Sequence, residues 1–146
     1  MKKKCYVAGA SAQIELIEIF IAKLKEAGWK ITFDWTAKVR EVGNASPDDP
    51  MIRRAAALAD LDGVRRAEVL WLVQPDATST STGAWVELGA ALERRTLISE
   101  KLGIQFSSPL VVVSGSSKKC IFSDLADRRF ESHDDALEYL LRDYAS

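Results

Sequence analysis

Hydrophobic residues recur along the chain with two alternating periods, a pattern that predicts strands followed by helices. An apolar run over residues 5–8 ends at Gly9 and predicts a first strand. Apolar residues then recur at helical spacing until Gly28, at Ile14, Ile17, Ile21 and Leu24. Residues 31–35 predict a second strand. The chain therefore opens with a strand, a loop, a helix and a strand.

The middle of the chain continues this alternation after a long interruption. Residues 36–50 hold Gly43, Asn44 and two prolines, so they predict an irregular connection of the kind that can act as a lid. An alanine-rich segment at 51–66 predicts a helix. The apolar run 69–73 predicts a buried strand, and a polar loop at 74–82 follows it.

The C-terminal half predicts two further helices and two further strands. Helical spacing starts at Gly83 and runs past Glu100, although residues 96–99 can alternatively form a short strand; we favour the long helix. Residues 109–113 give the clearest strand, and 129–131 give a weak fifth one. Ser132 is placed to cap a final amphipathic helix.

Alternation of this kind is typical of a single α/β domain spanning residues 1–146. We expect a flavodoxin-like or Rossmann-like three-layer sandwich with a five-stranded, mostly parallel sheet. Ligands bind beyond the carboxyl ends of the strands in such sheets. That edge gathers residues 9–11, residues 34–36 and the loop 74–82.

Composition narrows the expected ligand to a small molecule. Twenty basic residues nearly balance 21 acidic ones, which leaves no electrostatic footprint for duplex nucleic acid or an anionic membrane. Cys5, Cys120 and the lone His133 make neither a disulfide framework nor a metal site, so no metal is expected. No signal peptide and no run of about 20 apolar residues is present, and we expect a cytoplasmic protein.

The segment 81–91 carries the most informative chemistry. Ser81 or Thr82 can cap a helix, and Gly83 lets a ligand approach the free amides at its positive end. Glu87 lies about one turn further on, among small apolar neighbours. A pocket carboxylate and an ordinary solvated glutamate are both compatible with this pattern.

A second carboxylate, Asp60, shares its predicted helix face with Ala56, Ala57, Gly63 and Val64. Such small and apolar neighbours are unusual for an acid that faces solvent. Asp62 faces elsewhere and pairs adequately with Arg66 at the fourth following position.

Tyr6 in the first strand either fills the core or aims its hydroxyl at such a carboxylate. Trp35 and Trp85 flank the same edge and can stack on a planar ring, whereas Trp71 is expected in the core and Trp29 is expected to cover the end of the first helix. Gly9 and Ser11 follow the first strand without G-x-G-x-x-G or a P-loop lysine, so no ATP or dinucleotide cofactor is expected.

Several of these segments, in this order and spacing, resemble the nucleoside 2-deoxyribosyltransferase family. They are Tyr6-Val7-Ala8-Gly9, Asp34-Trp35-Thr36, Ala59-Asp60-Leu61, Ser81-Thr82-Gly83, Glu87-Leu88-Gly89-Ala90 and Phe130-Glu131-Ser132. The resemblance covers nearly the whole chain. It implies cleavage or transfer at the N-glycosidic bond of a nucleoside, or of a deoxynucleoside monophosphate as in a related branch.

Residue by residue, the resemblance implies that Glu87 is the nucleophile, Asp60 assists the leaving base and Tyr6 positions Glu87. It also implies that Ser81 and Gly83 hold a 5′-phosphate, and that the chain forms a homodimer or a larger homo-oligomer. Where the monophosphate hydrolases carry a phosphate-binding arginine, this chain has Ala10, Ser11 and Ala12. An arginine elsewhere, at position 40, 53 or 54, is the alternative phosphate ligand.

These roles agree with the physical chemistry of the reaction. Glycoside cleavage passes through an oxocarbenium-like transition state, so one carboxylate must stay ionised and a second acid must protonate the leaving group. We expect the helix start and a Tyr6 hydrogen bond to keep Glu87 ionised, and desolvation to raise the pKa of Asp60. The alternatives are an inactive nucleotide-sensing module on the same fold and a phosphoribohydrolase or NAD-cleaving relative.

Overall fold

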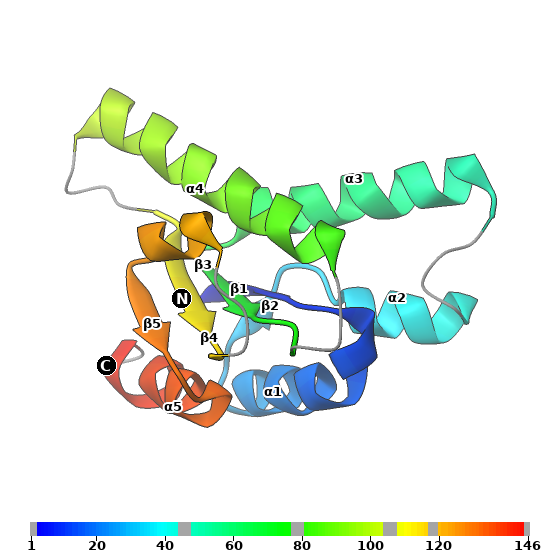
Figure 1. Cartoon of the computed structure of the whole chain (residues 1–146), viewed down its shortest axis with the longest axis horizontal. Helices are drawn as coiled ribbons and strands as arrows, with labels where there is room; N and C mark the ends of the chain where they lie inside the picture. The colour runs from blue at the N-terminus through cyan, green and yellow to red at the C-terminus, as the bar shows by residue number, and fades with distance from the viewer. Residues whose placement is uncertain (1–2, 44–47, 77–80, 104–107, 117–119, 145–146) are drawn as a thin grey trace.

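Five parallel strands form the centre of the molecule (Figure 1). The computed structural model describes residues 3–43, 48–76, 81–103, 108–116 and 120–144. The strands are Lys4–Ala8 (β1), Lys30–Ile31 (β2), Val69–Val73 (β3), Leu110–Ser114 (β4) and Arg128–Phe130 (β5). Their order in the sheet is β2-β1-β3-β4-β5, and every neighbouring pair is parallel. The predicted α/β sandwich is confirmed, with a sheet that is parallel throughout.

Helices cover both faces of the sheet. In Figure 1, the α3 and α4 helices lie over one face, and α1 and α5 lie against the other. The helices are Ile14–Glu26 (α1), Trp35–Val42 (α2), Pro50–Arg66 (α3), Thr82–Leu102 (α4) and His133–Glu138 (α5). Shorter turns span Ser11–Gln13 (η1), Ile121–Leu125 (η2) and Tyr139–Tyr144 (η3), the last with π-helical bonding.

Burial explains why the three central strands read as unbroken apolar runs. All five residues of β3 are buried, because helices cover it from both sides. Trp71 of β3 packs its ring 4.9 Å from that of Phe20 on α1. Trp71 therefore lies in the core as expected, and Trp29, just after α1, is buried as well.

Side-chain caps fix where the two long helices begin. Asp49 accepts a hydrogen bond from the Met51 amide, and Pro50 occupies the first turn of α3. Ser81 accepts one from the Ala84 amide, 3.2 Å away, at the start of α4. The α4 helix then continues to Leu102, so the long helix is confirmed and the alternative strand at 96–99 is wrong.

The second predicted strand and the connection after it need correction. The structure has a strand only at Lys30–Ile31, and Trp35 already begins α2. The cause is Asp34, whose carboxylate accepts hydrogen bonds from the Thr36 and Ala37 amides and so caps a helix. Much of the predicted irregular connection is therefore helical, while its residues 44–47 lie outside the described part of the chain.

At Gly9 and Gly63 the backbone lies too close to neighbouring atoms for a side chain to fit. These contacts help to position the carboxyl edge of the sheet. A Cβ on Gly9 would lie 2.3 Å from Cδ1 of Ile17 and 3.3 Å from the Val73 carbonyl oxygen. A Cβ on Gly63 would lie 2.7 Å from Cβ of Phe33 and 2.9 Å from Cδ2 of Tyr6. The bare backbone at Gly63 thus lets α3 pack directly on the Tyr6 ring of β1.

We predict that Gly63→Ala destabilises the protein by about 1–3 kcal/mol, because the added methyl group overlaps atoms that cannot move freely. Gly89→Ala is the matched control, since a Cβ on Gly89 in α4 meets nothing within 4 Å. That change should stabilise by up to about 1 kcal/mol through helix propensity. Urea unfolding of both variants measures the difference, and equal effects would contradict the close packing of α3 on β1.

Candidate functional site

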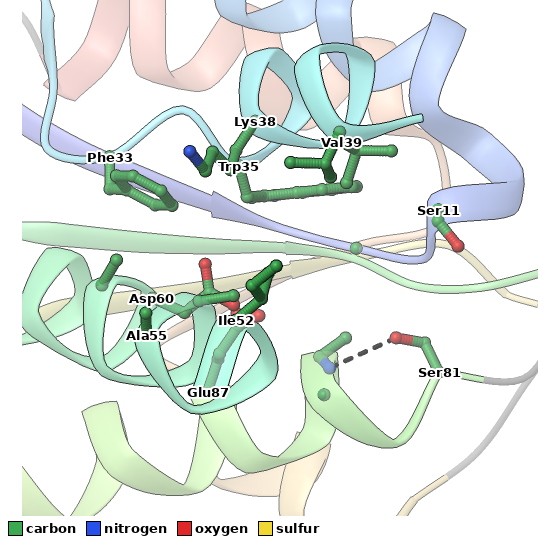
Figure 2. Close-up of a pocket in the computed structure, with 16 residues that line it drawn as sticks. Ser11, Phe33, Trp35, Lys38, Val39, Ile52, Ala55, Asp60, Ser81 and Glu87 are labelled. Atoms are coloured by element: carbon green, nitrogen blue, oxygen red, sulfur yellow. Dashed lines mark hydrogen bonds between the residues drawn. The ribbon is translucent and has the colours of Figure 1, made fainter. Parts of the chain in front are cut away.

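A cavity of about 680 Å³ opens at the carboxyl edge of the sheet, between α2 on one side and α3 and α4 on the other (Figure 2). Gly9 and Ser11 reach it from the end of β1, and Ser81 and Gly83 reach it from the start of α4. The volume is in the range of sites that enclose small organic ligands.

The two carboxylates singled out in the sequence both line this cavity. Glu87 comes from the second turn of α4, and its residue surface is only 7% exposed. Asp60 comes from α3 and is partly buried. Figure 2 shows their side chains close together on the same side of the cavity.

Tyr6 links the carboxylates from beneath the cavity. Its hydroxyl donates a hydrogen bond of 2.8 Å to Oε2 of Glu87, and its ring is fully buried in β1. The same hydroxyl interacts with the Asp60 carboxyl group. Because burial and the two nearby acids raise the pKa of Tyr6, the phenol stays protonated and remains a donor. Tyr6 therefore holds the Glu87 carboxyl group by a hydrogen bond and does not itself line the cavity.

Burial weakens both acids. Desolvation raises the pKa of Asp60 to about 6, and the interaction with Tyr6 opposes this shift. Desolvation also raises the pKa of Glu87 to about 8; the Tyr6 hydrogen bond lowers it, and the charge of Asp60 raises it further. Between about pH 6 and pH 8 the pair consequently holds one proton.

Burial also bears on the ionisation of Glu87. The raised pKa values of Glu87 and Asp60 mean that the two carboxyl groups of the ligand-free pair share one proton near neutral pH. The helix start is more than a turn away from Glu87, and one phenol hydrogen bond does not offset the loss of water around a carboxylate that is almost fully covered. The expectation of a raised pKa for Asp60 agrees with the structure.

Small and hydroxyl-bearing residues form the opposite end of the cavity from Phe33. Ser11 and Ser81 lie together there in Figure 2, and Gly83 adds no side chain between a ligand and the α4 amides. The Ser81 hydroxyl accepts the capping bond from Ala84. This end of the cavity offers hydroxyl groups and a positive helix terminus.

Three predicted ligand contacts do not line the cavity. Asp34 caps α2 and pairs with Lys25 at 3.6 Å, so its carboxylate already has partners. Thr82 is exposed at the first position of α4, because Ser81 takes the capping role. Trp85 packs against the core. Asp62 behaves as expected and accepts a 2.8 Å bond from Arg66.

The sequence analysis missed most of the α2 wall. Phe33, Lys38, Val39 and Val42 line the cavity beside the predicted Trp35, and Ile52 faces them from α3. The helical spacing of apolar residues within 35–42 could have revealed this wall, had the segment not been interpreted as an irregular connection. Arg40 pairs with Glu18 at 2.7 Å, and Lys38 is the cation among the lining residues that the structure describes.

Within the described ranges, no group of three or more histidine, cysteine or acidic residues is arranged to hold a metal ion. Nor does any helix in those ranges combine the length and apolar character needed to cross a membrane. In comparisons with known proteins, no family model matches the chain, and no curated protein sequence matches it significantly. The site therefore has to be interpreted from its own geometry.

The raised pKa of Glu87 predicts a specific dependence of stability on pH. The folded protein binds this proton more tightly than the unfolded chain, so stability is lost as pH rises from about 4.5 through 8. Glu87→Gln should remove that loss, which is on the order of 5 kcal/mol. Chemical unfolding from pH 4 to pH 9 measures it.

The matched control for this experiment is Glu100→Gln, which removes an exposed carboxylate from the same helix. If the stability of the wild type and of Glu87→Gln depends on pH in the same way, Glu87 ionises normally in the folded protein. The buried carboxyl group would then hold no proton near neutral pH.

Proposed function

We propose that the protein cleaves or transfers the N-glycosidic bond of a deoxynucleoside or a deoxynucleoside 5′-monophosphate, with Glu87 as nucleophile. The observation that carries the proposal is the convergence of Glu87 and Asp60 on one cavity, with the Tyr6 hydroxyl between them. These residues lie far apart in the chain, and the sequence resemblance to the nucleoside 2-deoxyribosyltransferase family assigns a role to each of them.

The chemistry requires two acids in opposite protonation states. The Glu87 carboxylate attacks C1′ of the sugar as the bond from C1′ to the base nitrogen breaks. The bonding electron pair leaves with the base, which takes a proton from Asp60. Water or a second base then attacks C1′ as the bond from C1′ to Glu87 breaks, and the proton of the attacking group passes to the Asp60 carboxylate. The choice between the two attacking groups decides hydrolysis or transfer.

Without substrate, Glu87 and Asp60 together hold one proton. The reaction requires that this proton lie on Asp60. Tyr6 interacts with both acids and thereby links the sites between which the proton moves. Positive charge that develops on the sugar favours the ionised form of Glu87, because opposite charges a few ångströms apart attract strongly in a dry cavity. The substrate itself therefore helps to shift the proton to Asp60.

The two ends of the cavity suit the two ends of a nucleoside. Ser11, Ser81 and Gly83 suit the sugar 5′ side, where the start of α4 can accept a hydroxyl or a phosphate. Phe33 and Trp35 suit the planar base. Asp60 and Glu87 then lie between these ends, near the bond to be broken (Figure 2).

Apolar side chains on the outer side of α3 and α4 favour a homo-oligomer. Leu61, Ala90, Leu97 and Ile98 line a groove between these helices, and roughly half of Leu97 is exposed. Four charged residues, Arg65, Glu93, Arg94 and Lys101, line the same groove. Apolar residues surrounded by charged ones are compatible with an interface. We propose that a second copy of the chain covers this groove.

Incubation of the purified protein with a panel of nucleosides and 5′-monophosphates, with and without a second free base, tests the activity. We expect release or exchange of the base, measured by chromatography. Glu87→Ala should lower kcat/KM by at least about a thousandfold, since it removes the nucleophile. Glu100→Gln, on the same helix, should leave the rate unchanged.

Absence of base release and exchange with every substrate would contradict the proposed reaction. Ligand-induced thermal stabilisation under those conditions would instead support a binding module, because a ligand that binds only the folded state raises its stability.

The oligomer is tested by light scattering coupled to size exclusion. The wild type should elute as a dimer or larger assembly, and Leu97→Asp should dissociate it by placing a charge among the apolar residues of the groove. Ile121→Asp alters an exposed apolar residue outside that groove and serves as the control. A monomeric wild type at micromolar concentrations would refute the assembly.

A further inference from the structure

The walls of the cavity that face each other across the carboxylates are largely apolar. Trp35 and Val39 project from the α2 side, and Ile52 and Ala55 project from the α3 side (Figure 2). Val42, Ala56 and Ala59 extend the same walls. A ligand that fills this region consequently meets methyl, methylene and aromatic carbon rather than hydrogen-bonding groups.

These walls hold few polar groups. The indole Nε1 of Trp35 donates a 2.8 Å hydrogen bond to the Val7 carbonyl oxygen, which leaves only the carbon surface of the ring for a ligand. Lys38 forms an exposed ion pair with Glu41 at 3.5 Å, and its side chain is 47% exposed. Among the described lining residues of α2 and α3, Lys38 and Asp60 are the charged side chains, and the proposed reaction uses Asp60 on the leaving nitrogen.

Two large apolar side chains at this cavity remain open to solvent. Val42 at the end of α2 is 42% exposed, and Ile52 in the first turn of α3 is 44% exposed. Exposed carbon surface gains free energy when another apolar group covers it. Because both residues also line the cavity, a group on the bound ligand can provide that cover.

We infer that the substrate carries an apolar substituent on its base, and that Val42 and Ile52 determine this specificity. The inference rests on the proposed function and adds the substrate class: deoxynucleosides with alkylated bases in preference to unsubstituted ones. Recognition is by contact with carbon surface and not by reading the hydrogen-bonding edges of the base.

Two alkyl series test the inference, because the ring position of the substituent is open. One contains 2′-deoxyuridine and its 5-methyl, 5-ethyl and 5-propyl derivatives, and the other contains 2′-deoxyadenosine and its N6-alkyl derivatives. We expect kcat/KM for base release to rise by about fourfold for each added CH₂ in at least one series. A flat or falling dependence in both series overturns the inference.

Variants of Val42 and Ile52 test whether these residues cause the preference for alkylated bases. Val42→Thr and Ile52→Thr introduce a hydroxyl into a branched side chain, so they should flatten the dependence on chain length by about tenfold over three carbons. Ile19→Thr is the matched control, since Ile19 is an exposed isoleucine of α1 that does not line the cavity. Equal flattening in the control, or none in either cavity variant, contradicts the assignment.

Binding separates this inference from the proposed reaction. Thermal shifts of the Glu87→Gln variant with the same compounds report affinity without turnover. If the wild type releases base from all members equally, the reaction stands and the inference fails. If no base is released but the thermal shift rises with alkyl length and falls in Ile52→Thr, the apolar site stands and the proposed reaction fails.

Discussion

The hydrogen bond from Tyr6 to Glu87 is the interaction around which the site is arranged. It is 2.8 Å long and almost fully buried, and it connects the inner strand β1 to the helix α4. Tyr6 can serve both acids only because α3 comes close enough to bring Asp60 to the same hydroxyl. The absence of a side chain at Gly63 permits that approach, so a packing constraint of the core also sets the geometry of the carboxylate pair.

Burial of the pair has an energetic cost that the fold tolerates. Two carboxyl groups in an apolar cavity hold one proton near neutral pH because a second negative charge there would lack solvation. One carboxyl group of such a pair is protonated and the other is ionised. Glycosidic cleavage requires both forms within one site. The proposed reaction uses this property directly, and the apolar walls that desolvate the acids also form the region assigned to the base of the substrate.

The sequence predicted the architecture well, because hydrophobic period and chain order largely determine a parallel α/β sheet. The strands β1, β3 and β4 and the long helix α4 appear as unbroken patterns in the sequence. The association of Tyr6, Asp60 and Glu87 was expected from the family resemblance, because the residues themselves left the roles of Tyr6 and Glu87 open. Local patterns were sufficient for the architecture but not for the association of these three side chains.

Features that depend on competition between neighbouring groups were not predictable in the same way. The sequence predicted a strand up to Trp35, but the Asp34 cap starts a helix at that residue. Because this helix was not predicted, the α2 wall of the cavity was not predicted either. The ionisation of Glu87 depends on how completely the surrounding elements of the fold cover it, which sequence spacing does not express. The first feature is local, because the Asp34 cap bonds to amides only two and three residues away, whereas the second depends on tertiary contacts.

Titration of the Glu87 carboxyl group tests the shared proton most directly. In protein labelled with ¹³C at the glutamate side-chain carboxyl carbons, the signal that is missing from Glu87→Gln identifies this residue. We expect its chemical shift to change with a midpoint near pH 8, well above the ordinary value of 4.5. A midpoint at or below 4.5 would mean that Glu87 is solvated in the folded protein, and the shared proton on which the site depends would not exist.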